Sequence, residues 1–118
     1  MIRDHPWMGS GLGTWSTAYP KYAKFDRGVF ANQAHNDWAQ WTCEGGLPFA
    51  ALMLWIAIWS VRASRHALWG IGIVTVLIHC SVDYPIQRPA LGAIFFVWLG
   101  LLASAATSKQ KGHFLPLL

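Results

Sequence analysis

The residues most capable of chemistry begin with a histidine, an amide and a carboxylate in succession, His35-Asn36-Asp37, followed by Glu44. A histidine accepts a proton near neutral pH because its ordinary pKa is about 6.5, and a carboxylate such as Asp37 or Glu44 would orient its ring. The structural alternative is that Asn36 or Asp37 caps a short helix, with His35 as a polar surface residue. This stretch therefore predicts either a general base or a helix cap.

A second polar stretch, "HCSVDYPIQRP", closes a later apolar run. His79 and Asp83 are costly beside an apolar segment unless they pair or face a cavity. Tyr84-Pro85 ends the helix, because the residue before a proline avoids the helical region. Arg88 adds a cation that suits phosphate oxygens. The stretch is either the rim of a site or a turn with its charged ends in water.

A third stretch, "GSGLG", brings Gly9, Gly11 and Gly13 together. The spacing differs from the dinucleotide fingerprint, and no predicted strand precedes it. Glycines permit tight turns and a close approach of the backbone, either to a diphosphate or sugar or within an ordinary loop. Arg27 follows this loop, and its guanidinium could hold an anionic leaving group beside His35.

Neither a metal site nor a Ser-His-Asp arrangement is predicted. The histidines and acids of these stretches show no metal-ligand spacing. Cys43 and Cys80 form no C-x-x-C pair, so each is interpreted as a small buried apolar residue, with a disulfide as the alternative.

The composition indicates the elements that must position these residues. The chain of 118 residues is 54% hydrophobic and 12% charged, whereas a soluble domain carries about 25% charge. Apolar runs cover residues 47–61, 67–82 and 89–106, and a membrane span needs about 20 residues. We therefore predict an all-α polytopic membrane protein fragment with three transmembrane helices. The basic residues do not cluster as a nucleic-acid site requires.

The charges predict the orientation of these helices. The loop after the first run and the segment after the third contain basic residues and no acid: Arg62, Arg65, Lys109 and Lys111. The positive-inside rule places both segments, including the tail 107–118, in the cytoplasm. Residues 1–46 then form an extracytoplasmic loop at the same face as Asp83. A helix from about 36 to 44, ended by Gly45-Gly46, would lie in the membrane interface.

Taken in their order along the chain, the three stretches resemble the O-antigen ligase and O-antigen polymerase family of bacterial membrane glycosyltransferases. "RDHPWMGSGLGTW" resembles the family's H-P-W-x-G-x-G-x-G loop, and "AHNDWAQWTCEGGLP" resembles its H-N-[DE] block. "HCSVDYPIQRPA" resembles its H-S-x-x-D-[FY]-P segment, so the likeness covers residues 2–106.

This resemblance implies an enzyme of the bacterial inner membrane that is independent of metals and cofactors. It would move a glycan from undecaprenyl diphosphate, at the periplasmic face, to lipid A-core, a polysaccharide or a protein. The catalytic histidine of the family corresponds to His35, and Arg27, Arg3 and Arg88 are the candidates for the diphosphate. The supporting residues would be Asn36, Asp37, Glu44, His79 and Asp83, with the glycine loop of Gly9, Gly11 and Gly13.

The family has about a dozen spans, whereas this chain offers three. We therefore expect the chain to be the C-terminal part of a longer enzyme and to be inactive alone. The alternatives are a small three-span scaffold or partner subunit without catalysis and, less favoured, a transporter fragment.

Overall fold

The computed structural model describes residues 1–24, 28 and 31–113, which form helices and loops with no strand among them. The predicted all-helical class is confirmed. The elements are α1 (Trp15–Ala18), η1 (Tyr19–Lys21), α2 (Asp37–Ala63), η2 (Leu68–Gly70), α3 (Ile71–His79) and α4 (Pro89–His113).

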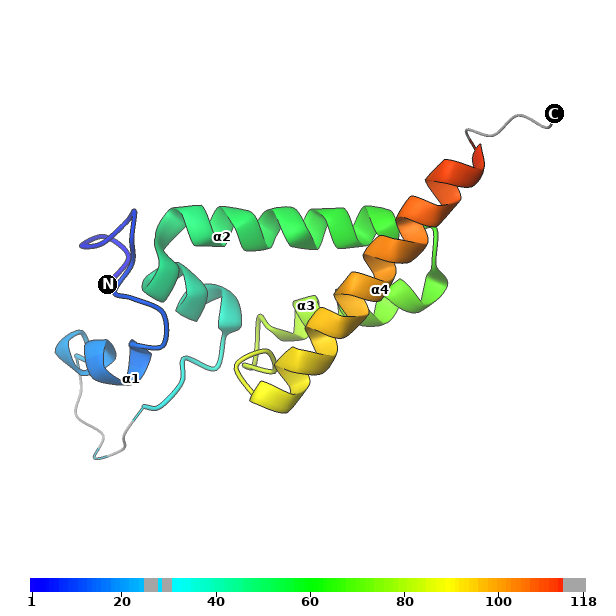
Figure 1. The fold of residues 1–118 in the computed structure, drawn as a ribbon. Coiled ribbons are helices and arrows are strands. Elements are labelled where there is room, and N and C mark those ends of the chain that lie inside the picture. The colour runs from blue at the N-terminus through cyan, green and yellow to red at the C-terminus, as the bar shows by residue number, and fades with distance from the viewer. Residues whose placement is uncertain (25–27, 29–30, 114–118) are drawn as a thin grey trace.

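Helix α2 consists of two arms that meet at a kink. Gly46 has φ 72° and ψ −175°, a non-helical conformation that a glycine adopts without steric cost. Pro48 lies at the start of the second arm, where a missing backbone N–H is tolerated. Figure 1 shows the first arm folded back beneath the second. The kink falls where Gly45-Gly46 was predicted to end a short helix.

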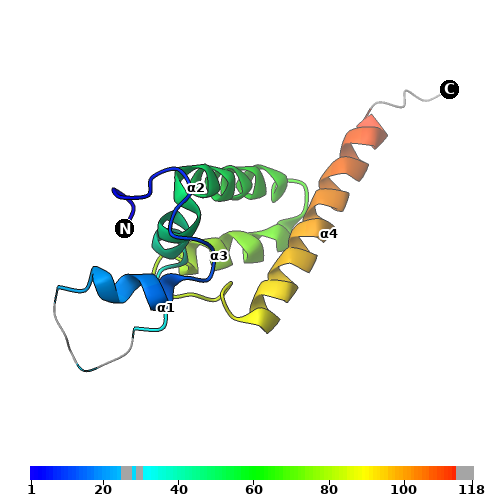
Figure 2. The same ribbon diagram turned by 60° about the vertical axis from the view of Figure 1, so that its left-hand side comes forward.

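The core lies where α2, α3 and α4 meet. Its buried side chains are Ala63, Ile73, Leu77, Phe95 and Leu102. Figure 1 shows α4 crossing α3 and the end of α2, and both views show its C-terminal part extending beyond them (Figures 1 and 2). The Trp38 indole N–H donates to the Leu77 carbonyl over 3.0 Å, which fastens the first arm of α2 to α3.

Within the second predicted span, 67–82, the helical part ends before the apolar run does. The regular helix α3 covers nine residues, and the apolar helical stretch including η2 is Leu68–His79. After His79 the chain enters turns, and the carbonyls of Cys80 and Ser81 accept hydrogen bonds from the start of α2. Helix α4 continues beyond the third predicted span, 89–106, and ends at His113.

Two helices are long and apolar enough to cross a membrane, Asp37–Ala63 and Pro89–Ser108. Large apolar side chains on the helices face outward, including Trp55, Ile78 and Val97, which are 62%, 68% and 61% exposed. A soluble monomer rarely leaves so many large apolar side chains exposed to water. The exposed faces and the length of the two helices indicate a membrane protein.

Candidate functional site

The segment around His35 is joined to the turn after α3 by backbone and side-chain hydrogen bonds. The Asn36 side chain caps α2 by accepting from the Ala39 N–H over 2.9 Å, and its amide donates to the Ser81 carbonyl over 2.8 Å. The Asp37 N–H donates to the Cys80 carbonyl over 2.9 Å. The predicted cap is therefore formed by Asn36, which also fixes His35 against the turn.

Asp37 is a buried part of this junction. Its side chain has no exposed surface, and its Oδ2 accepts from the Ile86 N–H over 3.1 Å. Through this hydrogen bond Asp37 holds the turn in place. Both cysteines are free, and Cys80 is buried in the same junction.

His35 and His79 lie on either side of one carboxylate. Nδ1 of His35 is 3.6 Å from Oδ1 of Asp83, and Nε2 of His79 is 3.7 Å from Oδ2. The His35 side chain is 71% exposed, so its ring is open to solvent. His35 also has a φ of 50°, a conformation that is uncommon for residues other than glycine. The acid beside His35 is therefore Asp83, not Asp37 or Glu44.

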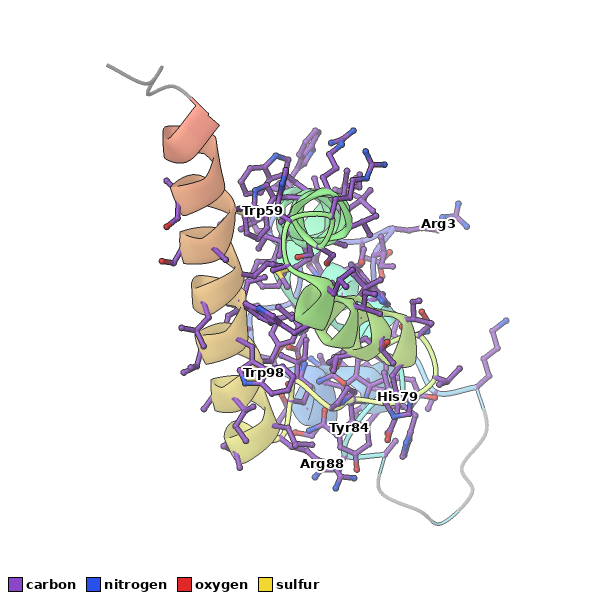
Figure 3. All side chains as sticks on the ribbon, turned by 90° about the vertical axis from the view of Figure 1, so that its right-hand side faces the viewer. Arg3, Trp59, His79, Tyr84, Arg88 and Trp98 are labelled. Carbon is purple, nitrogen blue, oxygen red and sulfur yellow. The ribbon has the colours of Figure 1, made fainter. Side chains whose placement is uncertain are left out.

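Tyr84 connects His35 to Arg88. The rings of His35 and Tyr84 meet edge to face, with centroids 4.9 Å apart and an interplanar angle of 76°. The Arg88 guanidinium carbon lies 5.1 Å from the Tyr84 ring centroid, within the range of a cation–π contact. Figure 3 shows His79, Tyr84 and Arg88 together at one end of the molecule. Sequence reasoning treated Tyr84 only as a helix breaker, and its position between an acid and a proline was the signal available.

The surroundings of Asp83 favour its ionised form. A hydrogen bond from the Tyr84 backbone N–H is the main cause that lowers the pKa of Asp83. Desolvation opposes this lowering of the pKa, and the charges of Arg88, His79 and His35 add smaller effects that lower it further. Near neutral pH the site therefore combines a fixed negative charge with an exposed histidine and an exposed arginine.

Glu44 lies between the N-terminal segment and the first arm of α2. Its side chain is buried and accepts from the Trp15 N–H over 2.8 Å and the Gly13 N–H over 3.0 Å. The amide of Gln40 donates to the same carboxylate over 3.3 Å. Glu44 thus anchors the N-terminal segment to the first arm of α2.

The glycine loop packs against the kink of α2. Gly9, Gly11 and Gly13 all have positive φ values. A Cβ atom on Gly9 would lie 2.1 Å from the Glu44 carbonyl oxygen, so only glycine fits there. Since the Gly11 N–H also donates to that carbonyl over 2.9 Å, the close approach is to the protein's own backbone.

The structure separates the candidate arginines. Arg88 adjoins Tyr84, whereas Arg3 is exposed and points away from that cluster (Figure 3). Arg27 lies outside the described residues. Within the described part of the chain no group of three or more metal-binding side chains occurs.

The arrangement places a proton acceptor, His35, and a cation, Arg88, at one exposed rim. The chain was also compared with known protein families. Residues 1–53 match the O-antigen ligase family. This match confirms the resemblance over residues 1–53, which include the glycine loop, His35 and Glu44, whereas the stretch 79–90 lies outside the matched residues. The family implies a glycosyltransferase-like ligase that acts on lipid-linked glycans in a membrane. No curated protein and no solved structure matches the chain.

Proposed function

We propose that the chain is the C-terminal part of a bacterial inner-membrane glycosyltransferase of the O-antigen ligase type. It transfers a glycan from undecaprenyl diphosphate to an acceptor hydroxyl at the periplasmic face. The observation that carries this proposal is the position of His35. This histidine lies in the family-matched segment, with its ring exposed and its Nδ1 3.6 Å from Asp83.

His35 is the general base in this proposal. Its Nδ1 faces the Asp83 carboxylate, which favours the tautomer that leaves Nε2 to accept the proton of the acceptor hydroxyl. The hydroxyl oxygen then bonds to the anomeric carbon while the bond from that carbon to the diphosphate oxygen breaks. The negative charge of Asp83 stabilises the protonated ring that results. A separation of 3.6 Å shortens readily when substrate binds, as catalytic contacts often do.

The leaving diphosphate needs positive charge, which arginines provide. Arg88 is exposed and adjoins the His35 cluster through Tyr84. In our proposal Arg88, Arg3 and Arg27 contribute to holding the diphosphate, together with groups from the rest of the enzyme. Such electrostatic stabilisation is usually a large part of catalysis, so we expect this chain alone to transfer no glycan.

We further propose that the chain crosses the membrane three times, at about 47–61, 67–82 and 89–106. Residues 1–46 are then periplasmic, and 107–118 form a cytoplasmic tail. The 12 residues of Leu68–His79 extend roughly 18 Å as helix, less than the hydrocarbon thickness of about 30 Å. The apolar composition of Leu68–His79 and its packing against α2 and α4 support this crossing.

Replacement of His35 tests the function. In membranes that contain the full-length parent, His35→Ala should lower glycan transfer from undecaprenyl diphosphate by about 100-fold or more, the usual contribution of a general base. His66→Ala is the matched control, since His66 is exposed in the turn that follows the C-terminal end of α2, whereas His35 precedes its N-terminal end. Transfer at the wild-type rate in His35→Ala would exclude the assigned role.

A further inference from the structure

We propose that Tyr84 is a positioning residue that holds the ring of His35 and the guanidinium of Arg88 at one rim. This inference rests on the proposed function, since it concerns the same reaction. In this role Tyr84 sets the distance between the His35 ring, which accepts the proton, and the Arg88 guanidinium, which binds the leaving diphosphate.

His35 needs an external support. Its side chain is 71% exposed, and its contact with Asp83 at 3.6 Å is longer than a hydrogen bond. Its backbone is in the left-handed region, which a residue other than glycine keeps only where the surroundings hold it. The edge-to-face contact with Tyr84 supplies packing against the ring itself.

The Tyr84 ring is well placed to provide that support because its backbone is held on both sides. On one side its N–H bonds to the Asp83 carboxylate, and on the other the N–H of Ile86 bonds to buried Asp37. Pro85 restricts the backbone of Tyr84 further. A half-buried aromatic ring on such a backbone has only two side-chain torsions to fix.

The same ring also restrains Arg88. An exposed arginine samples many rotamers, and the cation–π contact at 5.1 Å favours those that keep the guanidinium beside the His35 cluster. These contacts involve the ring of Tyr84, so phenylalanine should preserve the edge-to-face packing and most of the cation–π attraction. Leucine should abolish both.

The first measurement is independent of catalysis. The chain is held in detergent micelles, and the NMR resonance of the His35 ring protons is assigned as the one that is lost in His35→Gln. Tyr84→Leu should shift this resonance, whereas Tyr84→Phe should shift it little. The Trp38 indole N–H resonance reports that α2 and α3 remain packed. If Tyr84→Leu fails to fold by this marker, His35→Gln tests the same contact, because it should shift the ring protons of Tyr84. The proposal would be overturned if Tyr84→Leu left the His35 ring-proton resonance unchanged and His35→Gln left the Tyr84 ring-proton resonance unchanged.

The second measurement is glycan transfer by the full-length parent. Tyr84→Leu should lower kcat by roughly 10- to 100-fold and raise KM for the lipid-linked donor, with Tyr84→Phe near wild type. Tyr22→Leu is the control, because Tyr22 interacts with Asp4 in the N-terminal segment. If Tyr84→Leu transferred glycan at the wild-type rate while His35→Ala was inactive, the positioning role of Tyr84 would be refuted and the proposed function would stand. Wild-type transfer in His35→Ala would instead refute the proposed function, and the positioning role with it.

Discussion

Replacing Glu44 by alanine should release the N-terminal segment from α2 while leaving the helix intact. Alanine is the best helix former, so the first arm of α2 keeps its backbone. The change removes the buried carboxylate that accepts from the Trp15 and Gly13 N–H groups over 2.8 and 3.0 Å. The structural consequence should therefore appear in the loop and α1.

The magnitude follows from where the two donors lie. Trp15 is buried, so losing its hydrogen bond to a charged acceptor costs about 1.5–3 kcal/mol. Gly13 is exposed, and water replaces the carboxylate there at a cost of about 0.5–1 kcal/mol. The local opening free energy should fall by about 2–4 kcal/mol in total. Since 1.4 kcal/mol is tenfold, the open population rises roughly 30- to 700-fold.

Amide hydrogen exchange measures this opening directly. In micelles the Trp15 amide of Glu44→Ala should exchange faster by that factor, while amides in α3 keep their protection. Thr42→Val is the matched control, because the Thr42 hydroxyl donates within α2, to the Trp38 carbonyl over 2.7 Å. If exchange at Trp15 changed less than about threefold, Glu44 would not be the anchor.

Three further predictions concern the kink, the carboxylate and the topology. Gly46→Ala should lower the melting temperature, because φ is 72° and a Cβ would lie 2.5 Å from the Trp7 carbonyl oxygen, whereas Gly100→Ala in open space should not. Folding lowers the pKa of Asp83, so its ionised carboxylate stabilises the fold above the carboxyl's ordinary pKa of 3.8. This stabilisation is lost as the pH falls through the lowered pKa of the folded chain. An acid titration of unfolding should therefore be less steep in Asp83→Asn below pH 4, and equal slopes would contradict this. With Cys43 and Cys80 replaced by serine, an impermeant thiol reagent applied outside intact cells should label Asn32→Cys and miss Arg65→Cys, and the opposite pattern would reverse the proposed orientation.

Local sequence patterns predicted much of the helical framework. Gly45-Gly46 marked the kink because glycine adopts the required conformation freely, and Asn36 was one of two named caps. Hydropathy predicted α2 and α4 but overestimated α3. Apolar character continues past His79, whereas the helix does not, because the carbonyls of Cys80 and Ser81 bond to Asp37 and Asn36.

The division within the site has a similar cause. Types and spacing of residues were sufficient to select His35, Asp83 and Arg88 as candidates, since those properties are local. Which acid adjoins His35 was decided by the fold, because the contacts that join its segment to the turn after α3 link residues 45 and 49 positions apart. The same packing turned Glu44 toward the N-terminal segment and brought Tyr84 against His35. The sequence by itself determined which groups are available for chemistry, and the tertiary structure decided their partners, because long-range packing leaves no periodic signal in the chain.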